Sequence, residues 1–381
     1  MMQSTQWKMY WRMGKSNRFL RYIFTVAVFA VWTCLFCVHV HAAQPFELHL
    51  LDVGQGQCVL IEAVSHYMLL DGGGRNASSF VVSYLKQLGI ENFDLIALSH
   101  YDEDHMSGLI GVLSVFRVGQ VLLPSYAGEG ELYQSFATAA VSNGAAILHP
   151  QAGDAFSLGN AAVEVVGPVR ADYAVDNDRS LAFRITYGSV SCLICGDAEE
   201  TAEMDMVSSG RDISADICVV SHHGSRTSTT DSFLDAVAPS YALISCGLGN
   251  SYGHPTMEVL QRLQERGIRM YRTDMQGTVI LYSDGNSIWS DLEPCQDWTP
   301  GIPEGQTRTM PLDNGTGQEA GSDAGESAEE VLYVCNTNTK KFHYPGCDSV
   351  NQMNESNRMN TNLSRDELIA QGYQPCGNCH P

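Results

Sequence analysis

The stretch of sequence that decides the fold is Ser99-His100-Tyr101-Asp102-Glu103-Asp104-His105-Met106-Ser107-Gly108. It directly follows an apolar, strand-like run at 93–99 and leads into a helical stretch at 106–116. Loops at the C-terminal ends of strands are where α/β folds place their chemistry. Four potential ligands, His100, Asp102, Asp104 and His105, stand within six residues here, and unpaired carboxylates are costly to bury without a cation. This mixture suits Zn, Mn or Fe, so the stretch predicts a metal site; a solvated polar loop is the alternative.

The pattern around this stretch predicts an α/β fold. Short apolar runs alternate with helical stretches from Phe46 to Leu292, and such alternation indicates a layered architecture. Adjacent strands early in the chain argue against a purely parallel sheet. We predict strands at 46–53, 58–63, 66–71, 93–99, 118–124, 162–168, 181–188, 190–196, 215–221 and 241–246. We predict helices at 78–89, 106–116, 198–208, 229–237 and 255–266.

Polar motifs follow several of the other predicted strands. They are Leu51-Asp52-Val53-Gly54-Gln55-Gly56-Gln57, Leu70-Asp71-Gly72-Gly73-Gly74, Asn177-Asp178-Arg179-Ser180-Leu181, Cys195-Gly196-Asp197, Ser221-His222-His223-Gly224-Ser225 and Tyr252-Gly253-His254-Pro255. With the opening stretch, and in the same order over 46–290, they resemble the motifs of the metallo-β-lactamase superfamily. Asp102 replaces the second His of its H-x-H-x-D-H motif, which is similar to the C-terminal hydrolase domain of the DNA-uptake protein ComEC. Gln57 stands where that subfamily has Asp.

This resemblance implies a fold and a set of metal ligands. The fold is the αββα metallo-β-lactamase sandwich. His100 and Asp102 would hold one ion, Asp104 and His105 would hold a second, and Asp197 would bridge the two. The expected cofactor is Zn or Mn, as one or two ions. Such ions lower the pKa of bound water, and the resulting hydroxide would attack the substrate.

The resemblance also implies roles for residues around these ligands. His222 and His254 are alternatives for the remaining ligand position, because relatives of the fold place that His in different loops; we assign it to His222. His223 is a ligand or a proton donor, and His223 or His254 would protonate the leaving group. Asp71 is expected to order the loop of the opening stretch through hydrogen bonds rather than to bind metal. Asn177 stands near the place of a missing third His, which favours a harder ion such as Mn there.

Both ends of the chain differ in composition from the predicted hydrolase domain at 44–293. Residues 1–43 combine a positively charged start, an uncharged apolar run at 22–38 and the small-residue site Val40-His41-Ala42. This pattern predicts a signal peptide, with a membrane anchor as the alternative, so we expect a protein that is secreted or anchored outside the membrane. Residues 294–330 are rich in Gly, Ser, Pro and acids and are predicted to form a disordered linker.

A compact C-terminal module is predicted at 331–381. Two short ligand pairs, one H-x3-C and one C-x2-C, are typical of a structural zinc site. The segment resembles the small zinc-binding domain of Ada-type DNA-repair proteins, which implies one structural Zn. Its ligands would be His343, Cys347, Cys376 and Cys379. Cys335 is the alternative to His343 as a ligand, and disulfides among the four cysteines of this module are the alternative to zinc.

Composition narrows the function. The chain has 43 acidic and 22 basic residues and a net charge of −21, which argues against a surface that binds nucleic acid non-specifically. Bound cations can still meet phosphate locally. The ComEC-like resemblance implies an exported nuclease or phosphodiesterase that acts on DNA. The alternatives are a hydrolase of small esters, lactones or phosphorylated cell-wall components, and a noncatalytic protein that binds nucleic acid or the cell surface.

Overall fold

The computed structural model describes residues 46–302 and, further on, 333–343, 347–351, 353–361, 363, 368–369 and 371–376. The chain divides into two compact units, residues 1–306 and 307–381, and each is described by itself. The predicted leader and the predicted linker beyond residue 302 lie outside the described residues, so the domain boundaries stay predictions. Across the described segments, no helix has the length and apolar character needed to cross a membrane.

The first unit contains two mixed β-sheets. The first sheet has eight strands, in the order β15 (Ile288–Trp289), β14 (Val279–Ser283), β1 (Phe46–Leu50), β2 (Val59–Ala63), β3 (His66–Leu70), β4 (Asn92–Ala97), β5 (Arg117–Leu122) and β6 (Ala146–Leu148). The second has seven, in the order β13 (Arg269–Arg272), β12 (Tyr241–Ile244), β11 (Ile217–Val219), β10 (Val190–Ile194), β9 (Ala182–Tyr187), β8 (Ala161–Gly167) and β7 (Ala155–Leu158). Pairing is antiparallel from β1 to β3 and parallel from β3 to β6. In the second sheet it is antiparallel from β7 to β10 and parallel from β10 to β13.

The two sheets pack face to face around one apolar core. Leu48 and Ile61 of the first sheet share this core with Phe183 and Ile194 of the second, and all four side chains are buried. Alternate residues face the core because side chains along a strand point to opposite faces. β8 shows the alternation clearly, since Val163 is buried while its neighbour Glu164 is exposed.

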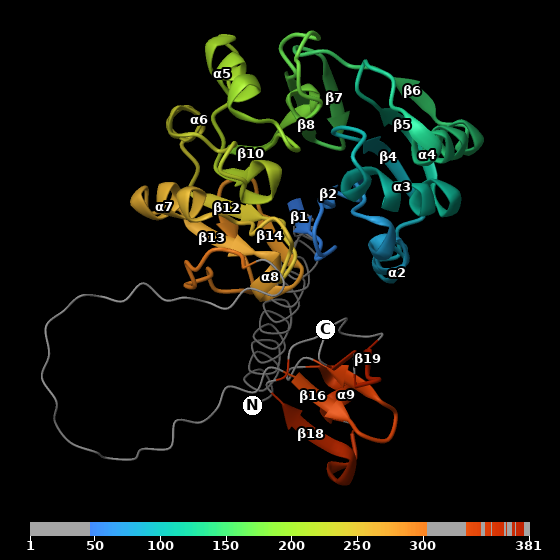
Figure 1. The fold of residues 1–381 in the computed structure, drawn as a ribbon. Helices are drawn as coiled ribbons and strands as arrows, with labels where there is room; N and C mark the ends of the chain where they lie inside the picture. Colours follow the sequence, from blue (N-terminus) through green and yellow to red (C-terminus); the bar gives the residue numbers. More distant parts are fainter. Residues whose placement is uncertain are drawn as a thin grey trace, which may run out of the picture. The chain divides into compact units, whose positions relative to one another are not determined.

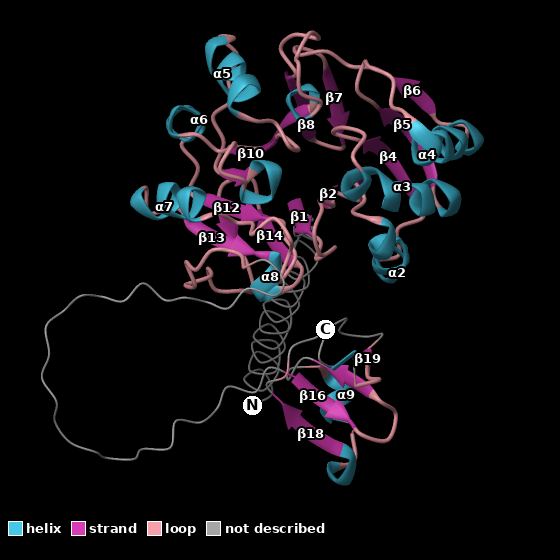
Figure 2. Ribbon diagram, viewed as in Figure 1, coloured by secondary structure: helices cyan, strands magenta, loops and turns pink. Residues whose placement is uncertain are grey.

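Helices cover the outer faces of both sheets. Figure 1 shows α2, α3 and α4 along one side of this unit and α5, α6 and α7 along the other, and Figure 2 shows the strands between them. The helices are α2 (Ser78–Gln87), α3 (Glu103–Val115), α4 (Gly130–Asn143), α5 (Glu200–Ser208), α6 (Asp231–Val237), α7 (Met257–Glu265) and α8 (Thr273–Gln276). Three short 3-10 turns are η1 (Arg75–Ala77), η2 (Asn177–Arg179) and η3 (Ser221–Gly224). The layers confirm the predicted αββα sandwich.

One boundary differs from its prediction in a way that matters for the site. The helix predicted from residue 106 begins at Glu103, with Asp102 as its N-cap in an extended conformation. Asp is a favoured N-cap residue, and the acidic Glu103 and Asp104 suit the positive end of the helix dipole. Asp104 and His105 therefore lie on the first turn of α3 and not in a loop before it.

The sequence analysis did not predict α4 or the strands β6, β7, β13, β14 and β15. Helix α4 buries only Phe136 and Ala140, so its apolar face is too narrow to give a clear helical pattern. The five strands have between two and five residues each. Runs this short are hard to distinguish from loops by periodicity alone.

The second unit is a small four-stranded sheet with short helical turns. Its strand order is β18 (Arg358–Thr361), β16 (Tyr333–Asn336), β17 (Lys341–His343) and β19 (Gln374–Pro375). The turns are α9 (Asp348–Asn351) and η4 (Glu355–Asn357). Tyr333, Phe342 and Leu368 belong to its apolar core. A core of this size rarely holds a fold without a further constraint.

Candidate metal centre

The predicted site residues lie on loops at one end of both sheets. His100 follows the end of β4, while Asp197, the turn η3 and His254 follow the ends of β10, β11 and β12. These last three strands are parallel neighbours, so their carboxyl ends meet at the same edge. His105 Nε2 lies 3.2 Å from an Asp197 carboxylate oxygen, which shows that the loops of the two sheets meet here.

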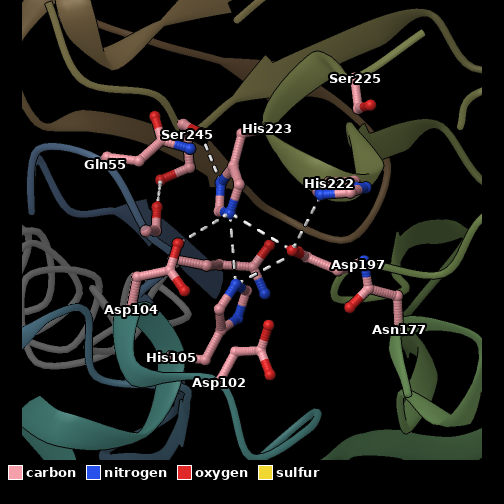
Figure 3. Close-up of polar contacts among 12 residues, drawn as sticks. Gln55, Asp102, Asp104, His105, Asn177, Asp197, His222, His223, Ser225 and Ser245 are labelled. Carbon is pink, nitrogen blue, oxygen red and sulfur yellow. Dashed lines mark hydrogen bonds and ion pairs between the residues drawn. The ribbon is translucent and has the colours of Figure 1, made fainter. Parts of the chain in front are cut away.

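Asp104, His105 and His223 form one group of potential ligands, and their ligand atoms all lie within 4.8 Å of one another. His223 Nε2 is 3.3 Å from His105 Nε2 and 3.5 Å from an Asp104 oxygen. Figure 3 shows Asp197 beside this group, and its carboxylate is 3.5 Å from His223 Nε2. The sequence analysis gave the remaining ligand position to His222, with His254 as the alternative. The structure places His223, for which the sequence analysis left a ligand or a proton-donor role open, in this group.

The hydrogen bonds behind this group show that its nitrogens are acceptors. His223 Nδ1 lies 2.9 Å from the Ser245 carbonyl oxygen, which can only accept, so Nδ1 carries the proton. His105 Nδ1 lies 2.8 Å from the Asp71 carboxylate and donates to it in the same way. In the neutral rings, both Nε2 atoms therefore present lone pairs to each other and to the carboxylates of Asp104 and Asp197. Four acceptors with no donor among them fit a cation.

A second group surrounds His100, which is fully buried. His100 Nδ1 is 3.0 Å from the Ser99 hydroxyl, whose own proton goes to Asp71, so Nδ1 is the donor. His100 Nε2 has no hydrogen-bond partner and lies 3.6 Å from an Asp102 oxygen and 3.9 Å from Asp197. His222 Nε2 is 3.7 Å from the same Asp197 oxygen. Asp197 therefore lies between the two groups, as a bridging carboxylate would.

The charges of the first group are strongly coupled. Burial raises the pKa of Asp104, but its hydrogen bond to His223 and the charge of His105 outweigh burial and lower this pKa to about 2. Burial lowers the pKa of His223, but Asp197 and Asp104 outweigh it and raise this pKa to about 9. His105 and His223 also hold the pKa of buried Asp197 well below its ordinary value. Without metal, a proton thus occupies the place of a cation, and metal binding must displace it.

Asp71 does not face the two ligand groups but holds them from behind. It is fully buried and accepts hydrogen bonds from the Ser99 backbone N–H, the Ser99 hydroxyl, the Gln57 side-chain amide and His105 Nδ1. Gln57, the departure from the ComEC-like motif, supplies a donor where a carboxylate would supply another acceptor. A carboxylate behind a ligating histidine fixes the ring and its tautomer.

Unusual backbone conformations place the two neighbouring histidines. His222 and His223 both adopt positive φ, 52° and 56°, and Gly224 follows with φ 84°. Such φ values cost of order 1–3 kcal/mol at a residue with a side chain and persist where the surroundings enforce them. The Ser225 N–H donates to the His222 carbonyl oxygen and the His222 N–H donates to the Gly196 carbonyl oxygen. The turn therefore directs the two imidazoles to different sides of Asp197.

His254 and Asn177 lie near the groups but belong to neither. The His254 ring centroid is 5.6 Å from that of His222 and 6.5 Å from that of His223. Burial and the charges of His223 and His222 lower the pKa of His254 to about 4, so it is neutral at pH 7. Asn177 donates a hydrogen bond to Glu199 at 3.0 Å.

The second unit brings its predicted zinc ligands together as far as it is described. The ligand atoms of His343, Cys347 and Cys376 lie within 4.8 Å of one another, and His343 Nδ1 is buried without a hydrogen-bond partner. Cys379 lies outside the described residues. Cys335 is fully buried in the apolar core with Phe342 and is not part of this group.

The sequence analysis named Asp71 for an orienting role but missed two other residues that orient the ligands. Ser99 contacts Asp71 and His100, and the Ser245 carbonyl holds His223. Ser99 lies directly before His100 at the end of a strand, and this position was the sequence signal that could have indicated its role. Ser245 acts through its backbone, and no sequence pattern identifies such a contact.

Comparison with known proteins identifies the family. Residues 51–248 match the sequence profile of the metallo-beta-lactamase superfamily, and the chain belongs to this superfamily. It therefore carries the fold of metal-dependent hydrolases, with the cluster of His and Asp side chains at the loop end of its sheets.

Two curated relatives match more than half of the chain, and the second of them is named a competence protein. ComE operon protein 3 of Bacillus subtilis is 30% identical over 251 residues, which is 61% of this chain and 32% of that protein. Competence protein ComA of Neisseria gonorrhoeae is 31% identical over 230 residues, 60% of this chain and 31% of that protein. The chain thus spans about a third of the length of these relatives. Among solved structures, the metallo-beta-lactamase fold protein YhfI from Bacillus subtilis aligns over 65% of this chain and 100% of its own, with 13% identity and a TM-score of 0.44.

Proposed function

We propose that the chain is an exported, metal-dependent phosphodiesterase whose substrate is DNA. The observation that carries the metal dependence is the convergence of four side chains from segments of both sheets, whose facing atoms are all acceptors when the two imidazoles are neutral. Asp104, His105 and His223 would hold one ion together with Asp197. His100, Asp102 and His222 would hold a second on the other side of Asp197. The mixed nitrogen and oxygen ligands suit Zn or Mn.

The chemistry divides between the ions and the protein. Bound divalent cations lower the pKa of water toward neutrality and neutralise charge on phosphate oxygens. Asp71 keeps the His105 proton on Nδ1, so that Nε2 stays an acceptor. Ser245 does the same for His223 through its carbonyl oxygen. His254 is neutral at pH 7, so it offers the substrate a hydrogen-bonding ring nitrogen rather than a stored proton.

Two features support a phosphodiester over a small ester. Arg75 and Arg226 are exposed, and within the described part of the chain neither forms an ion pair. Arg75 follows the glycines after Asp71, and Arg226 is three residues beyond His223. In so acidic a protein, two unneutralised arginines on the loops of the site favour an anionic substrate. The competence names of the relatives favour DNA among such substrates.

Two further parts of the proposal rest on sequence patterns. Residues 1–43 would direct export, as a cleaved signal or as an anchor. The C-terminal unit would hold one structural Zn through His343, Cys347, Cys376 and Cys379, and the first three of these side chains already converge.

The test is a substrate panel with the mature chain, residues 44–381. Single- and double-stranded DNA, RNA, bis-p-nitrophenyl phosphate, a lactone and a phosphocholine ester are incubated with the protein loaded with Mn or Zn. We expect cleavage of DNA, loss of this activity in His105→Ala, and full activity in His149→Ala, whose exposed ring bonds only the Pro124 carbonyl oxygen. Hydrolysis of a lactone or phosphocholine ester with all DNA left intact would replace the nuclease by the small-substrate hydrolase.

A further inference from the structure

An exposed aromatic ring stands at the rim of the metal centre. Tyr252 lies in the loop between β12 and α7 and is 68% exposed. Its inner face stacks on His254, with ring centroids 5.6 Å apart and planes inclined by 22°. Its neighbour in the same loop, Leu248, is 59% exposed. The loop beside the metal centre therefore presents two large apolar side chains to solvent.

The loop holds this ring in a fixed place. Asn250 is buried, and its side-chain oxygen accepts hydrogen bonds from the backbone N–H groups of Tyr252 and His254. Its side-chain nitrogen donates to the carbonyl oxygens of Gly247 and His254. One buried amide thus makes four hydrogen bonds within the loop, so the ring is preorganised and loses little entropy when it binds a partner.

The ring connects directly to the candidate ligands. The planes of His254 and His223 are inclined by 25°, with centroids 6.5 Å apart, so Tyr252, His254 and His223 form one continuous stack. His223 lies at one end of the stack, and its Nε2 faces the proposed ion. The other end is the outer face of Tyr252, which is open to solvent. A substrate whose phosphate lies at the metal centre would carry its neighbouring groups past this face.

A planar, apolar group is the natural partner for such a face. Nucleobases stack on aromatic side chains with little sequence preference, and this stacking is a main source of affinity for single strands. A paired base inside a duplex has both faces covered by its neighbours and is not free to stack on a protein ring.

We propose that Tyr252 is the stacking partner of an unpaired nucleobase that lies along the strand from the phosphodiester held at the metal centre, so that the preferred substrate is single-stranded nucleic acid. The inference rests on the proposed phosphodiesterase function and adds a base-binding subsite to it. Tyr252 is 68% exposed, and among the described residues its ring stacks on His254 alone, so its replacement should leave the fold intact, and a shift of His254 is separated from base stacking by the kinetics.

The experiment compares Tyr252→Ala with Tyr252→Phe and Tyr252→Trp in the Mn-loaded chain. The substrates are a single-stranded DNA oligonucleotide and an abasic oligonucleotide of the same length. Stacking of one base on an aromatic side chain corresponds to about a fivefold to hundredfold change in affinity. We expect Tyr252→Ala to raise KM for the base-bearing strand by this factor with little change in kcat, and to leave the abasic strand unaffected. Phe and Trp should retain the low KM.

A control and a direct readout accompany the kinetics. Trp289 is also an exposed ring stacked on another ring, Tyr282, with centroids 5.9 Å apart. It lies in β15, whose Ile288 carbonyl accepts a hydrogen bond from Tyr241 at the start of β12. The metal centre lies beyond the other end of β12, so Trp289→Ala should leave KM and kcat unchanged for both substrates. Stacking itself is measured by the quenching of a 2-aminopurine base in the first milliseconds after mixing, which Tyr252→Ala should abolish.

The outcomes separate the subsite from the proposed function. If the wild-type chain cleaves both strands with equal KM, or Tyr252→Ala leaves KM and quenching unchanged, the subsite is refuted while the phosphodiesterase stands. If Tyr252→Ala lowers kcat on both strands alike, the ring only positions His254 and the subsite is again refuted. If the wild-type chain cleaves neither strand, the phosphodiesterase falls and the subsite with it.

Discussion

Replacing Asp71 by Asn tests whether the residue behind His105 controls metal affinity. Asn is nearly isosteric with Asp and tolerates the positive φ of 61° at this position. The substitution removes a negative charge and turns one acceptor oxygen into an NH2 donor. Because all four hydrogen bonds to Asp71 come from buried donors, the change cannot be absorbed by water.

The structure gives the magnitude. One carboxylate oxygen of Asp71 accepts three hydrogen bonds and the other accepts only that of the Ser99 backbone N–H. In the Asn variant the NH2 group will face the Ser99 backbone N–H, and the remaining oxygen will keep the other three hydrogen bonds. This orientation leaves one buried donor unsatisfied, whereas the opposite orientation would leave three. An unsatisfied buried donor costs about 1–3 kcal/mol, so we expect the free energy of unfolding to fall by about 2 kcal/mol. His105 keeps its tautomer but loses its charged partner, which should weaken metal binding about 10- to 100-fold.

The assay measures both quantities on the same protein. Urea unfolding of the metal-free chain gives the stability, and competition with a chromophoric chelator gives the Zn and Mn affinities. Asp94→Asn is the matched control, because Asp94 also bonds a histidine, His66, and a backbone N–H, that of Tyr67, but on the surface. It should change metal affinity by less than about twofold. If Asp71→Asn folds and binds metal as tightly as the wild-type chain, the reasoning is refuted.

Three other predictions concern parts outside the metal centre of the first unit. Burial raises the pKa of Glu203 from 4.5 to about 7, so the native state binds this proton more tightly than the unfolded state does. The unfolding free energy of the wild-type chain, compared with that of Glu203→Gln, should then fall by about 3 kcal/mol as the pH rises from 4.5 to 7. A difference between the two proteins that does not change with pH in urea titrations would contradict this. Cys376→Ser should unfold the C-terminal unit alone in calorimetry, since its core is small; an unchanged transition would refute the zinc site. Gly108→Ala should lower the unfolding free energy by about 3 kcal/mol or prevent folding, because a Cβ there overlaps the backbone of Gly72, whereas Ser114→Ala on the exposed face of α3 should stay within about 0.5 kcal/mol.

The fold class and the position of the centre could be predicted because the signals are local. The stretch from Ser99 to Gly108 carries its ligands within one strand end and one helix turn, where spacing in sequence sets spacing in space. The Asp197 motif likewise ends a buried strand. Strand ends in a layered α/β fold converge at one edge, so several such motifs in order indicate one centre.

The choice among the later histidines could not be predicted in the same way. His222 and His223 are adjacent, and in regular structure the sequence would fix which of them points toward the centre. Their two consecutive positive φ values break that regularity, and no residue pattern reveals them beforehand. The approach of His223 to Asp104 also brings together segments that follow strands of different sheets. It therefore depends on how the two sheets pack across the core.

The position of the centre between the two sheets has a consequence for the lifetime of the protein. Asp104 and His105 lie on helix α3, which follows a strand of the first sheet. Asp197 and His223 follow strands of the second sheet. An ion held by all four would cross-link two halves that otherwise adhere through side-chain packing and a few hydrogen bonds, such as those from the Leu181 N–H to the Ser99 carbonyl oxygen and from the Ser245 hydroxyl to the Gly56 carbonyl oxygen. It stabilises the closed arrangement by about 4 kcal/mol when the free ion is at a thousand times its dissociation constant. Separation of the sheets at this edge, and with it access for proteases, therefore depends on the metal content of the surroundings as much as catalysis does.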